Sequence, residues 1–211
     1  IYVRSQFGRR YPMLPFDLLK IPIFSTSVAT SILSFTAQML GMVAMPFLLV
    51  NTFGYDAVGT GLLMTSWPLV IVFVAPIAGW LISKVHPGIL GGLGLVVMSI
   101  GCFSLSFVSP DEGHFGLVWR LMLCGAGFGM FQSPNNHLLL SSAPPQRAGS
   151  AGGMLATARL TGQTTGAALV ALMFHLFGDT APHDAMLLAG CLTLCGAVCS
   201  LTRLKERMPN S

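Results

Sequence analysis

The polar side chains that could do chemistry lie within a long apolar stretch, residues 119–169. Outside the connection at 141–150, the two helical segments of this stretch carry two arginines and four amides: Arg120, Arg159, Gln132, Asn135, Asn136 and Gln163. Guanidinium and amide groups act through hydrogen bonds, so the chemistry expected of them is recognition. Polar side chains at membrane depth are costly, and we therefore expect these to face a protein interior or a water-filled cavity rather than lipid.

Patterns typical of enzymes and metal sites do not occur in the sequence. The five histidines are scattered, without the H-E-x-x-H spacing of a zinc site, and there is neither a G-x-S-x-G turn nor a Ser–His–Asp arrangement. The cysteines lie in apolar runs without C-x-x-C spacing, which is typical of thiols that behave as small hydrophobic residues. They are Cys102, Cys124, Cys191, Cys195 and Cys199. We expect no enzyme activity, no metal and no resident cofactor.

The composition indicates an integral membrane protein. Of the 211 residues, 53% are hydrophobic and only 9% are charged, against roughly a quarter charged in an ordinary soluble domain. A soluble domain of this size could not cover its surface with so few charges. The net charge of +4 would suggest nucleic acid as a partner of a soluble protein, but basic residues beside membrane spans usually set topology or contact anionic lipid. We therefore expect the lipid bilayer, and no nucleic acid, as a partner.

Long uncharged runs between the charged residues predict the membrane spans. A helix needs about 20 mostly apolar residues to cross the hydrocarbon core. We predict an all-α bundle of six transmembrane helices at residues 22–50, 57–83, 88–108, 115–140, 149–177 and 185–203, with a kink or break near Gly41 and Pro46. The bundle occupies residues 21–203, between a cytoplasmic linker at 1–20 and a cytoplasmic tail at 204–211.

Basic residues in the connections predict the orientation. Nine fall in alternate connections and at the two ends, on one side of the membrane: Arg4, Arg9, Arg10, Lys20, Lys84, Arg147, Arg203, Lys205 and Arg207. The charged residues in the connections on the other side are all acidic: Asp56, Asp111, Glu112, Asp179 and Asp184. The side rich in lysine and arginine is the cytoplasm, so both ends of the segment should lie there. Because the chain opens on Ile1 and shows no signal peptide, we also expect it to be part of a longer protein.

One face of the first span combines small polar and polarisable side chains. The face is formed by Ser27, Ser31, Ser34, Gln38, Met42 and Met45, at steps of three or four residues. It could look into a polar cavity, with the methionines contacting an apolar ligand. Alternatively, the serines could form hydrogen bonds with their own helix or with a neighbouring one.

Small residues and the two arginines raise further alternatives. Two G-x-x-x-G pairs, Gly125–Gly129 and Gly162–Gly166, favour close helix packing over ligand binding. Arg120 lies near a helix end, where its side chain could reach the membrane surface. Arg159 lies deeper, and its partners would be carbonyls, amides such as Gln163, or residues outside this chain.

Three runs in this region form a family pattern: RLMLCGAGFGMFQSPNN at 120–136, RAGSAGGM at 147–154 and ATARLTGQTTG at 156–166. They resemble the major facilitator superfamily, and more narrowly the C-terminal half of its fourteen-helix drug:proton antiporters, which export lipophilic cations. The run GWLISK at 79–84 resembles the superfamily's loop motif, with Ser83 where an aspartate is expected.

The resemblance implies that the first and fourth spans line a central cavity. It implies substrate-facing roles for Gln38, Met42, Phe131, Gln132, Asn135 and Asn136, and gating or packing roles for Arg120, Arg159, Gln163, Gly125, Gly129, Gly162 and Gly166. It further implies proton-driven efflux across a bacterial inner membrane, together with an N-terminal half of the same transporter. A metabolite, sugar or peptide transporter of the same fold is the alternative, and a polytopic membrane scaffold or enzyme a more remote one.

Overall fold

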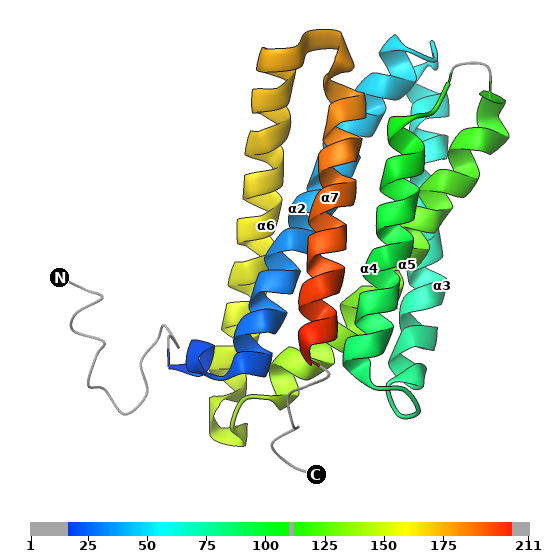
Figure 1. Cartoon of the computed structure of the whole chain (residues 1–211). Coiled ribbons are helices and arrows are strands. Elements are labelled where there is room, and N and C mark those ends of the chain that lie inside the picture. Colours follow the sequence, from blue (N-terminus) through cyan, green and yellow to red (C-terminus); the bar gives the residue numbers. More distant parts are fainter. Residues whose placement is uncertain (1–16, 110–111, 204–211) are drawn as a thin grey trace.

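The computed structural model describes residues 17–109 and 112–203. Most of the predicted linker and the predicted tail at 204–211 therefore lie outside the described residues. The described chain is almost entirely helical and contains no strand (Figure 1). Its long helices are α2 (Pro22–Asn51), α3 (Ala57–Leu81), α4 (Pro87–Ser106), α5 (Gly113–Ser141), α6 (Ala148–Phe177) and α7 (Ala181–Thr202).

These helices have the length and composition of membrane spans. Four of them qualify individually, and so does the continuous helical segment Pro145–Thr202, which holds both α6 and α7. The chain reverses between these two helices at Gly178, whose φ of 56° favours glycine. The predicted six-helix membrane bundle is confirmed, with helix ends that differ from the predicted ones by at most four residues. Pro46 does not break α2, which is continuous from Pro22 to Asn51.

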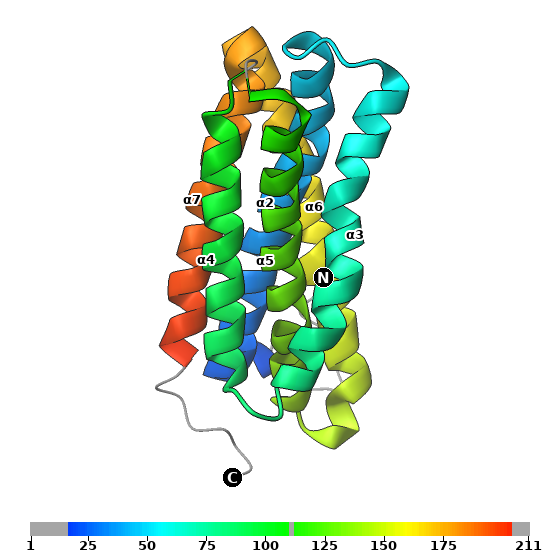
Figure 2. The ribbon, with the colours of Figure 1, turned by 90° about the vertical axis from the view of Figure 1, so that its right-hand side faces the viewer.

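The helices pack as an open arc in the order α3, α5, α4, α7, α2, α6. The extensive contacts are those of α5 with α3 and α4, of α7 with α4 and α2, and of α2 with α6. Figure 2 shows α3 along one edge of the bundle and α7 with α4 toward the other, and Figure 1 shows α6 along an edge. Because α3 and α6 end the arc, they have the fewest buried residues of the six helices.

Glycines bring the neighbouring backbones into direct contact. A Cβ on Gly125 would lie 2.3 Å from the carbonyl oxygen of Trp67 in α3, and one on Gly127 would lie 2.3 Å from the amide nitrogen of Met98 in α4. Helix α5 is therefore held closely on two sides. In α6, a Cβ on Gly166 would lie 2.6 Å from the carbonyl oxygen of Thr36 in α2.

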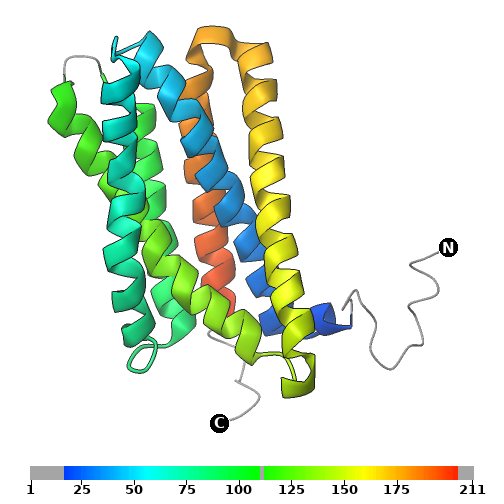
Figure 3. The ribbon, with the colours of Figure 1, turned by 180° about the vertical axis from the view of Figure 1, so that it is seen from behind.

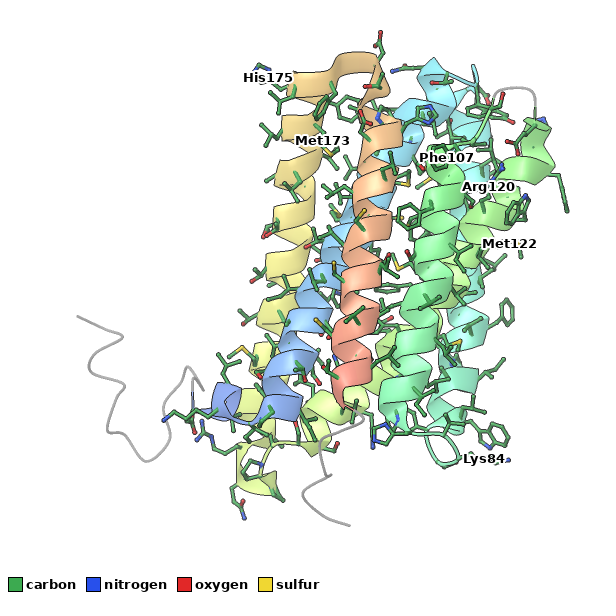
Figure 4. All side chains as sticks on the ribbon, viewed as in Figure 1. Lys84, Phe107, Arg120, Met122, Met173 and His175 are labelled. Carbon is green, nitrogen blue, oxygen red and sulfur yellow. The ribbon has the colours of Figure 1, made fainter. Side chains whose placement is uncertain are left out.

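The two ends of the bundle differ in charge. The end that holds the α3–α4 connection carries Lys84, whose Nζ lies 3.8 Å from the ring centroid of Trp80. We call it the basic end, because Lys20, Arg147 and Arg203 also lie there. Figure 4 shows Lys84 at this end, and Arg120 and His175 toward the opposite end. That opposite end holds the connections with Asp56, Glu112 and Asp179.

Candidate functional site

A pocket of about 210 Å³ lies between α2, α5 and α6. These helices approach one another toward the basic end of the bundle (Figure 3). The lining residues combine polar side chains with small and apolar ones: Phe35, Gln132, Asn136, Gly152, Leu155, Ala156 and Arg159. The structure thus brings Gln132, Asn136 and Arg159, which are distant in the sequence, into one cavity.

The pocket offers an aromatic ring, two amides and one positive charge. Gln132 and Asn136 are one helical turn apart, so both side chains lie on the same face of α5. The guanidinium carbon of Arg159 lies 5.4 Å from the ring centroid of Phe35, within the range of a cation–π contact. Such a set of groups can bind a molecule through hydrogen bonds to its carbonyl or anionic oxygens and through contact with a flat apolar surface.

Arg159 lies well inside α6. It lies eleven residues after the first residue of α6, which corresponds to about 16 Å along the helix axis, and a hydrocarbon core is about 30 Å thick. Within the described residues it makes no ion pair. No aspartate or glutamate occurs in α2, α3, α4, α5 or α6, so among these helices the charge of the pocket is positive.

Asn135 lies on α5 between the pocket amides but points into the bundle. It is 1% exposed. Its Nδ2 donates to Ser31 Oγ at 2.7 Å and to the Ser27 carbonyl at 3.4 Å, both on α2. Its Oδ1 accepts a hydrogen bond from Arg203 Nη1 at 2.9 Å. Asn135 therefore joins α2, α5 and the end of α7 and does not line the pocket.

Arg203 was not among the predicted site residues. It stands just after α7 and is 1% exposed. Besides Asn135, it donates through Nη2 to the Thr26 carbonyl at 3.0 Å and to Thr30 Oγ1. Its position beside a predicted span end indicated a topology signal, and no pattern in its own helix indicated burial. The one available signal lies on α2, where closely spaced serines and threonines offer acceptors.

The polar face of α2 divides between the bundle interior and its surface. Ser27, Ser31 and Ser34 are fully buried. Ser27 and Ser34 donate to carbonyls of their own helix, and Ser31 accepts from α5, which matches the second of the two alternatives for these serines. Gln38 is half-buried and Met42 is 37% exposed, and neither lines the pocket.

Phe131 and Arg120 lie away from the pocket. Phe131 is 1% exposed and packs with Leu95 and Ala197 in a core between α5, α4 and α7. Arg120 forms an ion pair with Glu112 at the end of α5 opposite the basic end. Figure 4 shows Arg120 toward that end of the bundle. The Arg120 guanidinium and the Ser109 amide hold the pKa of the Glu112 carboxyl below its ordinary value. Arg120 therefore reaches toward the membrane surface.

The glycine pairs lie at helix contacts. Gly125 and Gly129 face α3, and Gly162 and Gly166 face α2. The carbonyl of Gly162 accepts a hydrogen bond from Thr36 Oγ1 at 3.2 Å. Gln163, the next residue, is half-buried and does not line the pocket.

Comparison with known proteins agrees with this architecture. The family model for the Major Facilitator Superfamily matches residues 4–167. The chain is 50% identical over 205 residues to the uncharacterized transporter YebQ of Escherichia coli (strain K12), covering 97% of this chain and 45% of that protein. It is 30% identical over 169 residues to the riboflavin transporter RibZ of Clostridioides difficile, covering 80% of this chain and 37% of that protein.

A more distant relative carries a drug-resistance name. The chain is 26% identical over 174 residues to the multidrug resistance protein Stp of Mycobacterium tuberculosis, covering 82% of this chain and 32% of that protein. The chain thus spans less than half the length of these relatives. The matched model, the six apolar helices and the relatives together show that the chain belongs to the Major Facilitator Superfamily, whose members are multi-pass membrane transporters and not enzymes.

Proposed function

We propose that this chain is the C-terminal half of a secondary transporter that exports small lipophilic molecules, driven by the proton gradient across a bacterial inner membrane. The observation that carries the proposal is the pocket of amides, an aromatic ring and Arg159 between α2, α5 and α6. Polar groups at membrane depth are rare outside substrate and ion pathways. The coupling to protons rests on the resemblance to drug:proton antiporters.

The proposed partner is an N-terminal half of the same transporter. In alternating access, two bundles rock against each other around a site near the middle of the membrane. The exposed faces of α3 and α6 at the edges of the arc support this arrangement. Exposed residues on α3 include Leu69, Val72, Phe73 and Ile77, and those on α6 include Leu160, Thr161, Thr164 and Thr165. The six-helix segment alone should not transport.

The proposed orientation places the basic end in the cytoplasm. Lysine and arginine concentrate in cytoplasmic connections, and all described connections at this end carry at least one, whereas those at the other end carry none. By this orientation the pocket lies in the cytoplasmic part of the bundle. That placement suits a transporter that loads its substrate from the cell interior.

The first candidate substrate class is lipophilic cations. The resemblance to drug:proton antiporters and the name of the relative Stp support it. A buried cation needs an opposite charge nearby, and the described helices that form this pocket contain no acidic residue. Under this proposal the acidic partner comes from the N-terminal half.

The second candidate is flat aromatic compounds that carry carbonyl or anionic oxygens. Arg159 favours it, because its guanidinium attracts such oxygens and repels a cation. Gln132 and Asn136 can donate further hydrogen bonds to the same oxygens. The name of the relative RibZ, a riboflavin transporter, is in keeping with this class.

An efflux assay on the full-length protein tests the proposal and separates the two classes. Cells that express it would be loaded with ethidium, a lipophilic cation, or with riboflavin, and efflux would be followed with and without a proton uncoupler. Uncoupler-sensitive efflux of either compound supports the transporter. Efflux of neither compound by well-expressed protein would contradict both candidate classes.

Arg159→Gln then distinguishes the classes. If riboflavin is the better substrate, the variant should lose most of its efflux; if ethidium is, the variant should retain it or improve it. Arg120→Gln is the matched control, since Arg120 is an arginine at the opposite end of the bundle and outside the pocket. Equal losses in both variants would contradict a pocket role for Arg159.

A further inference from the structure

A buried polar network fixes the helical turn that carries the pocket amides. Arg203, Asn135, Thr30 and Ser31 are each at most 1% exposed. Arg203 is attached to α5 through Asn135 Oδ1 at 2.9 Å and to α2 through the Thr26 carbonyl at 3.0 Å. Asn135 continues to α2 through Ser31 Oγ at 2.7 Å. A single guanidinium therefore ties the end of α7 to the two helices that form two walls of the pocket.

The network and the pocket share the same turns of helix. Asn135 lies three residues after Gln132 and one before Asn136 on α5, and Ser31 lies four residues before Phe35 on α2. Any rotation of α5 that breaks the hydrogen bonds of Asn135 also moves Gln132 and Asn136 relative to Phe35. The pocket geometry is in this way coupled to bonds that are made outside the pocket.

This turn of α5 has a specific reason to need support. Pro134 lies within the helix and has no N–H, so the carbonyl four residues earlier, that of Met130, loses its helical partner. A helix is most easily bent or rotated at such a point. The network holds the helix one residue beyond the proline, where the helix's own hydrogen bonding is weakest.

We infer that Arg203 is a positioning residue for the pocket and acts through Asn135. Its planar fork gives separate N–H groups to α5 and α2 in a fixed geometry, which a lysine cannot reproduce. Loss of the fork lets the turn at 132–136 rotate away from Phe35 while the rest of the bundle keeps its glycine-mediated contacts. The inference rests on the proposed function only for its consequence in transport.

Labelling of introduced cysteines tests the positioning without any transported substrate. Asn136→Cys and, separately, Leu139→Cys would be placed in the full-length protein after its other reactive cysteines are replaced, and labelled with a water-soluble maleimide in membrane vesicles. Asn136 lines the pocket, whereas Leu139 is fully buried. The labelling rate at position 136 divided by the rate at position 139 reports how well the turn is held. Arg203→Lys should lower this ratio by about tenfold, which is the effect expected from the loss of one hydrogen bond to a charged group.

Ser200→Ala is the matched control. Ser200 lies on the last turn of α7, is fully buried and donates to the Gly88 carbonyl of α4 at 3.0 Å, so it fastens the same helix end to an element outside the pocket. The control should lower thermal stability but leave the labelling ratio unchanged. An unchanged ratio in Arg203→Lys, or an equal fall in Ser200→Ala, would overturn the inference in favour of general loosening.

Variants of Asn135 give the same test if Arg203→Lys does not fold. Asn135→Asp keeps the oxygen that accepts from Arg203, and its second oxygen can accept from the Ser31 hydroxyl in place of the bond that the Asn135 amide donates to Ser31. This variant should preserve the ratio, whereas Asn135→Leu should lower it as Arg203→Lys does. Where Arg203→Lys and Asn135→Leu both fold, the double variant should lower the labelling ratio no further than the more severe single variant does. Both substitutions act through the hydrogen bond between Arg203 and Asn135, so their effects should not add. Additive effects, or a preserved ratio in Asn135→Leu, would contradict action through Asn135.

Transport gives a separate reading. With whichever of ethidium or riboflavin is exported, Arg203→Lys should raise KM by about tenfold at equal protein abundance, and Ser200→Ala should not. If the labelling result holds but neither compound is exported, the proposed substrates are wrong and the positioning role stands. If export occurs and KM is unchanged while labelling falls, the turn does not form part of the substrate site.

Discussion

Substitution of Gly125 by alanine should push α3 and α5 apart. A Cβ at this position would lie 2.3 Å from the carbonyl oxygen of Trp67 and 3.1 Å from its carbonyl carbon. Both are backbone atoms inside a helix, so no side-chain rotation can relieve the overlap. Trp67 is itself fully buried, and its ring lies against Gly41 of α2. A shift of α3 at this point therefore disturbs α2 as well.

The size of the effect follows from this overlap. Favourable contacts between carbon and a carbonyl oxygen occur at about 3.3–3.6 Å, so the two backbones would have to separate by about 1 Å at Gly125. Forcing an extra carbon into a packed interior destabilises by about 1–3 kcal/mol. Alanine at a helical glycine also stabilises the helix by about 1 kcal/mol. The proper reference is therefore a Gly→Ala change that creates no overlap.

Gly153→Ala supplies that reference. Gly153 is an exposed residue in α6, and a Cβ there would meet nothing within 4 Å. Thermal unfolding of the detergent-solubilised full-length protein should place Gly125→Ala below Gly153→Ala by at most about 2–4 °C for each kcal/mol of difference, because the shift becomes smaller as the protein becomes larger. Gly129→Ala should fall between them, since its nearest contact is 3.3 Å. Equal melting temperatures for the variants at 125 and 153 would refute the backbone contact between α3 and α5.

Three further predictions concern single contacts. The Arg147 guanidinium holds the pKa of the Asp17 carboxyl below its ordinary 3.8, so Asp17→Asn should destabilise by at most about 1 kcal/mol at pH 7. The difference from the parent in thermal unfolding should stay constant down to pH 5 and close as the pH falls through that lowered pKa. Thr36→Val removes a buried hydroxyl that donates to the Gly162 carbonyl of α6 at 3.2 Å and to the Ile32 carbonyl of its own helix at 2.7 Å. It should cost about 0.6 kcal/mol in chemical unfolding, and a much larger loss would contradict this assignment. A membrane-permeant maleimide should label the exposed Cys195 and spare the fully buried Cys124 in the folded protein, which mass spectrometry would show.

The bundle was predictable because membrane spans are limited by a simple physical requirement. Every backbone polar group must be satisfied within the hydrocarbon, so an uncharged run of sufficient length has to be helical. The predicted spans at 57–83 and 149–177 match α3 and α6 within two residues. The order of the helices around the bundle was not predictable in the same way. The order depends on which helix packs against each glycine. Gly125 contacts the backbone of α3, whereas Gly127, two residues later, contacts the backbone of α4.

The candidate site was predictable in part. Gln132, Asn136 and Arg159 were singled out by their polarity in apolar runs, and the structure brings them together. Phe131 and Asn135 belong to the same stretch but point into the bundle. Successive residues of a helix point about 100° apart, and the sequence of one helix does not say which of its sides meets protein. A nearly all-apolar helix has no polar face to reveal this.

Arg203 shows that topology and packing can use the same side chain. The distribution of charges places Arg203 among the basic residues at one end of the bundle, and that distribution gives no reason to expect a packing role as well. A long basic side chain near a span end has two directions available, outward to the membrane surface or inward between helices. Arg203 turns inward, where the Thr26 carbonyl of α2 and Asn135 Oδ1 accept its hydrogen bonds. Arg120, with Glu112 beside it, turns outward. The hydrogen-bond acceptors near a span end thus decide whether its arginine turns into the bundle, as Arg203 does, or outward, as Arg120 does.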